Sequence, residues 1–128
     1  MSSSTGGTIR ILLIEDEVDA LNALKDYFDA HGLQVHTATT GEEGLQLLES
    51  EEPHIVILDM RLGSGITGME VLRRAKAMKT QAEIIVVTVV SDINVADLAR
   101  GLGAAGYLTK PFVIEDLERV VLSRLKDA

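Results

Sequence analysis

The sequence predicts an α/β fold in which helices cover both faces of a parallel β-sheet. Short runs rich in β-branched residues alternate with longer stretches of helical periodicity, which is typical of parallel strands joined by helical crossovers. Three of these runs are apolar throughout, as expected for strands buried on both faces. The chain has 128 residues, the length of one domain.

The alternation predicts five strands and five helices in one domain. The strands are expected at residues 9–14, 33–38, 54–58, 83–88 and 105–109. The helices are expected at residues 17–31, 41–50, 67–79, 92–102 and 113–126. We expect the domain to span residues 8–126, after a flexible tail at residues 1–7 that is rich in Ser and Gly.

The first half of the chain carries clear element signals. The run Ile11–Ile14 is apolar throughout, which predicts a central strand. The next helix has one apolar stripe, and Gly32 follows it as a stop. The stripe consists of Val18, Leu21, Leu24 and Phe28. The second strand alternates between apolar and polar residues, and Thr40–Glu43 then fits a capping box that opens a helix.

The second half repeats these signals. Two further apolar runs, Ile55–Leu58 and Ile84–Val87, predict central strands. Between them, Val71, Ala75 and Met78 face one side of a helix. The glycine-rich segment 101–106 leaves a helix and enters a strand, so we interpret it as a helix stop and turn, not as a dinucleotide-binding loop.

The order of the strands follows from these properties. The second strand alternates and the fifth is short, so both are expected at the edges of the sheet. Right-handed crossovers then favour the order 2-1-3-4-5. The expected architecture is a doubly wound, flavodoxin-like three-layer sandwich.

Composition narrows the range of functions. The net charge of −8 and the pI of about 4.8 argue against direct nucleic-acid binding by this domain. The absence of cysteine excludes thiolate catalysis and Cys-ligated zinc. No apolar run approaches the roughly 20 residues that span a bilayer, and the N-terminus lacks the features of a signal peptide. We therefore expect a cytoplasmic protein that does not bind membranes.

Polar residues stand where four of the apolar runs end. Glu15 and Asp16 follow the run at residues 11–14, Asp59 follows the run at 55–58, Thr88 follows the run at 84–87 and Lys110 follows residues 107–109. The carboxyl ends of parallel strands share one edge of the sheet, so these side chains should meet in one cleft. Three adjacent carboxylates need a positive partner, and oxygen ligands suit Mg²⁺. A carboxylate nucleophile, a divalent cation, a lysine and a hydroxyl are the groups needed to transfer a phosphoryl group onto an aspartate.

Four motifs make the chain similar to a known family over residues 8–126. They are Ile-Glu-Asp-Glu at 14–17, Ile-Leu-Asp-Met at 57–60, Val-Val-Thr at 86–88 and Gly-Tyr-Leu-Thr-Lys-Pro-Phe at 106–112. With these motifs the chain resembles the receiver domain of bacterial two-component response regulators. Any one motif is weak evidence, but the four together are highly specific.

The resemblance implies a role for each residue of the cleft. It implies that Asp59 is the phosphoacceptor, that Lys110 contacts the phosphoryl group and that the Lys110–Pro111 peptide is cis. It implies that Thr88 and Tyr107 form a switch pair. The implied Mg²⁺ ligands are Glu15, Asp16, Asp59 and the main-chain carbonyl of Arg61.

The resemblance also implies a mechanism and partners. A sensor histidine kinase or phosphotransfer protein would donate the phosphoryl group from a phosphohistidine. Phosphorylation would draw Thr88 inward, make room for Tyr107 and bias the fourth helix, fifth strand and fifth helix toward binding an output domain or protein. The domain would catalyse its own phosphorylation and dephosphorylation rather than act as a turnover enzyme, and would be a monomer or weak dimer.

The sequence departs from the family pattern at several positions. Gly63 stands where most members have proline, and its loop, residues 61–68, is longer by one residue and rich in glycine, so we expect it to be mobile. Val89 stands where Ala or Gly is usual, and we expect it to narrow access to the phosphoryl group and slow hydrolysis. Val120 and Leu122 widen the apolar stripe of the last helix, which fits either a broad core face or a partner surface.

Three other functions are compatible with parts of the pattern. A phosphatase with Asp59 as nucleophile, of the haloacid-dehalogenase type, needs a second acid two residues later, where Arg61 stands. A flavin-binding module of the flavodoxin type needs a phosphate loop after the first strand, where Glu15–Glu17 would repel phosphate. A silent receiver that acts as a docking scaffold would not need the full set of site residues.

Overall fold

The computed structural model describes residues 8–89 and 93–126, so the predicted tail at residues 1–7 lies outside the described residues. The strands are β1 (Arg10–Ile14), β2 (Gln34–Ala38), β3 (Ile55–Asp59), β4 (Glu83–Val89) and β5 (Gly106–Lys110). The helices are α2 (Val18–Ala30), α3 (Gly41–Glu51), α4 (Gly68–Ala77), α5 (Ile93–Gly101) and α6 (Ile114–Lys126). Each predicted element is present, with ends shifted by a residue or two.

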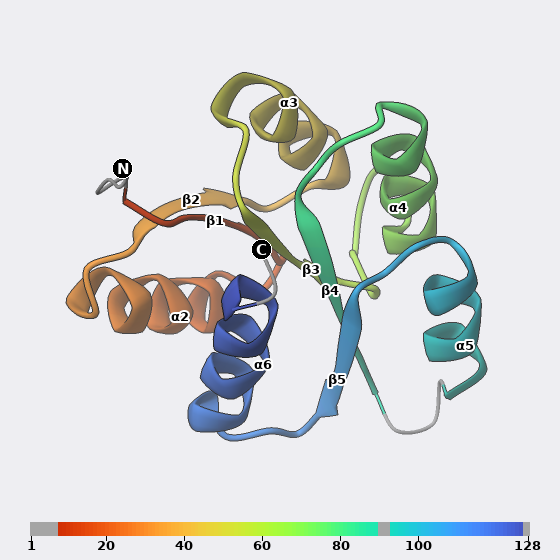
Figure 1. Ribbon diagram of the computed structural model, residues 1–128. Helices are drawn as coiled ribbons and strands as arrows, with labels where there is room; N and C mark the ends of the chain where they lie inside the picture. Colours follow the sequence, from red (N-terminus) through yellow and green to blue (C-terminus); the bar gives the residue numbers. More distant parts are fainter. Residues whose placement is uncertain (1–7, 90–92, 127–128) are drawn as a thin grey trace.

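All neighbouring strands are parallel, and their order is β2-β1-β3-β4-β5, as predicted. Helices α3, α4 and α5 cover one face of the sheet, and α2 and α6 cover the other (Figure 1). The fold is therefore the predicted doubly wound three-layer sandwich.

One apolar core lies on each face of the sheet. Leu12 and Ile14 of β1 point into the core under α3, α4 and α5, while Ile11 and Leu13 point into the core under α2 and α6. The central strands β1, β3 and β4 are almost wholly buried, whereas β2 and β5 are partly exposed. This confirms which strands are central and which are edges.

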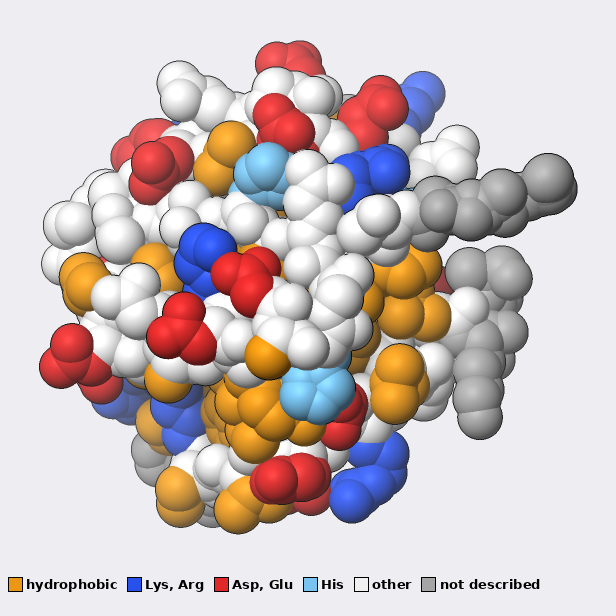
Figure 2. Space-filling model, turned by 90° about the vertical axis from the view of Figure 1, so that its left-hand side faces the viewer, with side chains coloured by type: hydrophobic (Ala, Val, Ile, Leu, Met, Phe, Trp, Pro, Cys, Tyr) orange, Lys and Arg blue, Asp and Glu red, His pale blue; other side chains and the backbone are white. Residues whose placement is uncertain are grey.

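The edge strand β2 is lined by polar groups. Figure 2 shows the side of the molecule that carries α2 and β2, where charged side chains of both signs and histidines are interspersed with apolar ones. The ring of His36 in β2 lies 3.3 Å from the carboxylate of Glu51. Such polar cover discourages the addition of another strand to an exposed edge.

Three strands end one residue later than predicted. Asp59 is the last residue of β3, Lys110 is the last of β5, and β4 continues past Thr88 to Val89. The reason is that the sheet pairing continues through the polar residues: Asp59 is in register with Val87, and Val89 with Lys110. The polar side chains are therefore held by the sheet itself.

Two residues assigned to apolar helix faces are exposed instead. Leu21 and Phe28 of α2 are buried, but Val18, in the first turn, is 54% exposed because the core on this face begins at Leu21. Met78 is 40% exposed because α4 has ended at Ala77. The predicted stop after α2 is present, and Gly32 has a φ of 81°.

The capping box of α3 differs in one detail from the prediction. The Thr40 hydroxyl accepts a hydrogen bond from the Glu43 N–H at 3.2 Å, but the Glu43 carboxylate accepts from Thr39 N–H at 3.0 Å and not from Thr40. Both bonds satisfy donors that the helix start leaves free.

Helix α6 divides its wide apolar stripe between core and surface. Leu117 and Val121 are buried, and Val120 is half-buried against the same core, which favours a broad core face for these residues. Leu122 is 50% exposed. Within the described part of the chain, no helix has the length and apolar character required to cross a bilayer.

Candidate functional site

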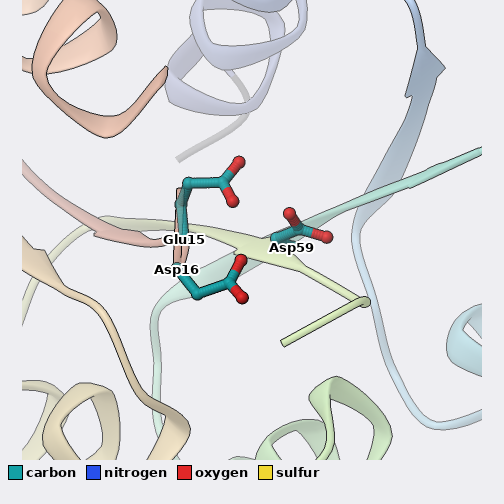
Figure 3. Close-up of side chains that lie close together, drawn as sticks. All are labelled: Glu15, Asp16 and Asp59. Carbon is teal, nitrogen blue, oxygen red and sulfur yellow. The ribbon is translucent and has the colours of Figure 1, made fainter. Parts of the chain in front are cut away.

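Three carboxylates converge at the carboxyl edge of the sheet. Glu15 and Asp16 follow β1 directly, and Asp59 ends the neighbouring strand β3. One carboxylate oxygen from each lies within 4.8 Å of the others (Figure 3). The parallel sheet thus brings together side chains that are far apart in the sequence, as the strand pattern predicts.

Lys110 joins two of these carboxylates. Its Nζ lies 3.0 Å from Asp59 Oδ2 and 3.1 Å from Glu15 Oε1. The other oxygen of Asp59, Oδ1, accepts a hydrogen bond from the main-chain N–H of Arg61 at 2.8 Å. Asp59 is only 6% exposed, so its carboxylate is held in a defined orientation at the bottom of the site.

The electrostatics of the cluster indicate an excess of negative charge. Burial, together with a hydrogen bond and charge repulsion from Asp59, raises the pKa of Glu15 to about 7, although Lys110 and the Glu17 N–H oppose this shift. Burial by itself lowers the pKa of Lys110, but the bonds and charges of Asp59 and Glu15 outweigh it and raise that pKa. One ammonium is therefore insufficient for three carboxylates.

The donor set fits a divalent cation. Three carboxylates and one ammonium leave two negative charges, which is the charge that such a cation balances. All the available ligand atoms are oxygens, and the number of carboxylates is small, which suits Mg²⁺ with water in its remaining positions. Glu15, Asp16 and Asp59 are the side chains that could hold it.

Thr88 places a hydroxyl in the interior without a partner. The residue is 1% exposed, and its Oγ1 has no hydrogen-bond partner among the residues that the structure describes. A buried hydroxyl in this state costs free energy, so such groups are uncommon in structural positions. The Thr88 hydroxyl can therefore bond an acceptor that arrives at the site.

Tyr107 lies on β5 with its side chain 41% exposed. The guanidinium of Arg100 in α5 lies 4.9 Å from the centre of its ring. The two residues that the resemblance pairs as a switch thus differ in the structure, because Thr88 is buried and Tyr107 faces the surface.

The loop between β3 and α4 is restrained by two carboxylates. The Gly63 N–H donates to Asp16 Oδ2 at 2.7 Å, and the Ile66 N–H donates to Glu42 Oε2 at 3.1 Å. Sequence reasoning missed both contacts, and the mobility expected from the glycines of this loop stays a prediction. A main-chain donor leaves no signature in composition or periodicity, so only the tertiary structure could identify it.

An open hollow lies beside the acidic cluster. It is lined by Glu17, Ala20, Val89, Lys110, Pro111 and Phe112. The Lys110–Pro111 peptide bond is cis, as predicted. Lys110 contacts the buried carboxylates and also lines this hollow.

Comparison with known proteins identifies the family. The family model described as "Response regulator receiver domain" matches residues 11–122. Among curated proteins, the chain is 29% identical over 112 residues to sporulation initiation phosphotransferase F of Bacillus subtilis, covering 88% of this chain and 90% of that protein. It is 36% identical over 122 residues to the aerobic respiration control protein ArcA of Escherichia coli, covering 91% of this chain and 50% of that protein.

Solved structures give the same result. The receiver domain of a putative LuxO repressor protein from Vibrio parahaemolyticus superposes with a TM-score of 0.88 at 26% identity, covering 94% of this chain and 92% of that one. A response regulator receiver domain protein from Clostridium thermocellum superposes with a TM-score of 0.86 at 30% identity, covering 93% and 95%.

The matches differ in how much of each relative they include. The chain spans most of the Bacillus phosphotransferase, but about half of ArcA and a quarter of the regulatory protein AtoC of Escherichia coli. Each of these matches covers about nine-tenths of the present chain. The chain belongs to the response regulator receiver domain family, which implies phosphoacceptor signalling in a two-component system.

Proposed function

We propose that Asp59 accepts a phosphoryl group from a phosphohistidine of a sensor histidine kinase or phosphotransfer protein, in a reaction that requires Mg²⁺. The observation that carries this proposal is the position of Asp59. It is a buried carboxylate at the carboxyl edge of the sheet, 3.0 Å from the Lys110 ammonium and beside the two acidic residues Glu15 and Asp16.

The site contains the groups that such a transfer needs. A carboxylate oxygen of Asp59 forms a bond to phosphorus while the bond from phosphorus to the donor imidazole nitrogen breaks, and the imidazole leaves with its electron pair. The Lys110 ammonium, already beside Asp59 Oδ2, stabilises negative charge on the phosphoryl oxygens. A bound Mg²⁺ would supply further charge neutralisation, held by Glu15, Asp16, Asp59 and the main-chain carbonyl of Arg61.

The switch would use the hydroxyl of Thr88, which has no partner within residues 8–89 and 93–126. A phosphoryl oxygen on Asp59 gives Thr88 Oγ1 an acceptor, and movement of Thr88 toward it leaves space that the ring of Tyr107 can fill. Tyr107 would then leave Arg100, which changes the surface formed by α5, β5 and α6. Phosphorylation thus shifts the population toward a state that binds an output domain or protein.

Val89 would set the lifetime of the phosphorylated state. It is in register with Lys110 and lines the hollow beside it, so its side chain lies on the approach to the site. Val89→Ala should therefore speed the loss of phosphate. Decay in the variant that is no faster than in the parent chain would contradict this role.

The test is incubation with acetyl phosphate and Mg²⁺, followed by intact mass spectrometry. The parent chain should gain one phosphoryl group, and Asp59→Asn should gain none. Asp26→Asn, which changes an exposed aspartate of α2 in the same way, should label like the parent. Equal labelling of the parent and Asp59→Asn would place the acceptor elsewhere.

A further inference from the structure

A main-chain amide contacts one of the carboxylates of the metal site. Gly63 N–H donates to Asp16 Oδ2 at 2.7 Å, across 47 residues of sequence. Lys110 contacts the other two carboxylates, those of Glu15 and Asp59. The cluster is therefore oriented by the Lys110 ammonium and by main-chain amides, and the amide that holds Asp16 comes from the β3–α4 loop.

The approach of the loop to Asp16 leaves no room for a side chain at position 63 unless Asp16 moves. A Cβ atom on this residue would collide with Asp16 Oδ2, the end of a flexible side chain, so the carboxylate would have to shift. The φ angle of Gly63 is not in the left-handed region, so the backbone conformation itself does not demand glycine. Its role is to let the N–H reach the carboxylate.

We propose that the Gly63 N–H is a positioning group for the divalent cation. By holding Asp16 Oδ2, it leaves Oδ1 free to face the cation. This inference rests on the metal site of the proposed function and adds a group from outside the acidic cluster. Donors that hydrogen-bond a metal-binding carboxylate fix its orientation, and their loss typically weakens metal binding 10- to 100-fold.

The same bond links the cation to the β3–α4 loop. The loop is held at Gly63 by Asp16 and at Ile66 by Glu42, and α4 begins soon after, at Gly68. A cation that fixes Asp16 therefore also fixes one of the anchors of the loop. The Gly63–Asp16 hydrogen bond thus couples occupation of the site to order in this loop, in addition to the bond from Arg61 N–H to Asp59.

Titration calorimetry with Mg²⁺ on the full chain tests the proposal. Gly63→Ala and Gly63→Pro both introduce a Cβ, but only proline removes the N–H. Gly63→Pro should bind Mg²⁺ about tenfold more weakly than the parent, and Gly63→Ala should lie between the two. The matched control is Gly101→Ala, because a Cβ at that position meets nothing within 4 Å.

The outcomes separate this inference from the proposed function. If the parent binds Mg²⁺ and is phosphorylated but Gly63→Pro binds as the parent does, only the positioning role fails. Equal weakening by Ala and Pro would also overturn it, because space and not the N–H would then matter. A parent chain that binds no Mg²⁺ would overturn the metal site and this inference together.

Amide hydrogen exchange measured by NMR tests the bond without changing Gly63. In the parent, the Gly63 amide should be protected both with and without Mg²⁺. Asp16→Ala should abolish that protection and leave the Ile66 amide, which is held by Glu42, protected. A Gly63 amide that exchanges equally fast in the parent and in Asp16→Ala would overturn the proposal.

Discussion

The amino edge of the β-sheet, where the strands begin, and the carboxyl edge, where they end, both carry ionisable groups, but the hydrogen bonds of these groups are arranged differently. At the amino edge, the Arg10 side chain donates to the main-chain carbonyls of Glu51 and Glu52, at 3.1 Å and 2.8 Å, and the Arg10 N–H donates to His54 Nδ1 at 3.0 Å. These groups have neutral main-chain or imidazole partners. These groups satisfy one another's hydrogen bonds at the amino edge, so no ligand or ion is needed there.

At the carboxyl edge, the charged and polar groups outnumber the partners that the described residues offer them. Three carboxylates there share one ammonium, that of Lys110, and the hydroxyl of Thr88 has no partner in the described part of the chain. Folded proteins accept such local costs mainly at functional sites. The difference between the edges therefore identifies the functional edge without reference to any relative.

The largest expected difference between the edges is in phosphorylation. Lys110→Ala should lower the rate of labelling by acetyl phosphate about 100-fold, because it removes the fixed positive charge beside Asp59. Arg10→Ala should label within about twofold of the parent, because the proposed P–O bond formation at Asp59 would take place at the other edge. Intact mass measured against time, at saturating Mg²⁺, gives both labelling rates. A comparable loss of rate in the two variants would show that phosphorylation does not distinguish the two edges.

Stability should respond in opposite directions at the two edges. Thr88→Val removes a buried hydroxyl that has no partner among the described residues and keeps the shape of the side chain, so it should raise the free energy of unfolding by about 1 kcal/mol. Arg10→Ala should lower it by about 1 kcal/mol because it removes hydrogen bonds from a charged group. Urea unfolding without Mg²⁺ measures both, and destabilisation by Thr88→Val would show that the hydroxyl is bonded at rest.

The carboxyl edge should make the metal-free protein less stable as the pH rises. The pKa of Glu15 is raised from 4.5 to about 7 by burial and by Asp59, so between these values the folded chain holds a proton that the unfolded chain has released. The stability contributed by this proton is present below about pH 4.5 and is lost as the pH rises through about 7, with an effect on the order of 1 kcal/mol. Urea unfolding in EDTA should show this loss in the parent, and Glu15→Gln should abolish it.

The amino edge should give a smaller effect of opposite sign. Burial and the charge of Arg10 lower the pKa of His54 below 6.5, so the folded chain binds fewer protons than the unfolded chain. The stability contributed by neutral His54 is present above pH 6.5 and is lost as the pH falls. His54→Asn keeps an acceptor for the Arg10 N–H but cannot titrate, so its unfolding should lack this acid-side loss, and an unchanged loss would assign it to another group.

The fold was predictable because the pattern along the chain reflects burial directly. The apolar run Ile11–Ile14 becomes a strand buried on both faces, and the alternating segment at residues 33–38 becomes an edge. Element ends were less predictable, because pairing with a neighbour extends β3, β4 and β5 through polar residues. Val18 shows a second limit, since an apolar residue on the correct helix face is exposed when the core does not reach it.

The sequence by itself determined the sheet, its strand order and the convergence of Glu15, Asp16, Asp59 and Lys110, because parallel strands have all their carboxyl ends at one edge. Only the tertiary structure decided which donor holds which carboxylate. The bond from Gly63 to Asp16 and the isolated hydroxyl of Thr88 depend on distances of a few ångströms between backbones that the sequence does not relate. The residue types in a sequence reveal the chemistry of its side chains. Main-chain N–H donors are present in almost every residue, so which of them has a role depends on where the fold places it.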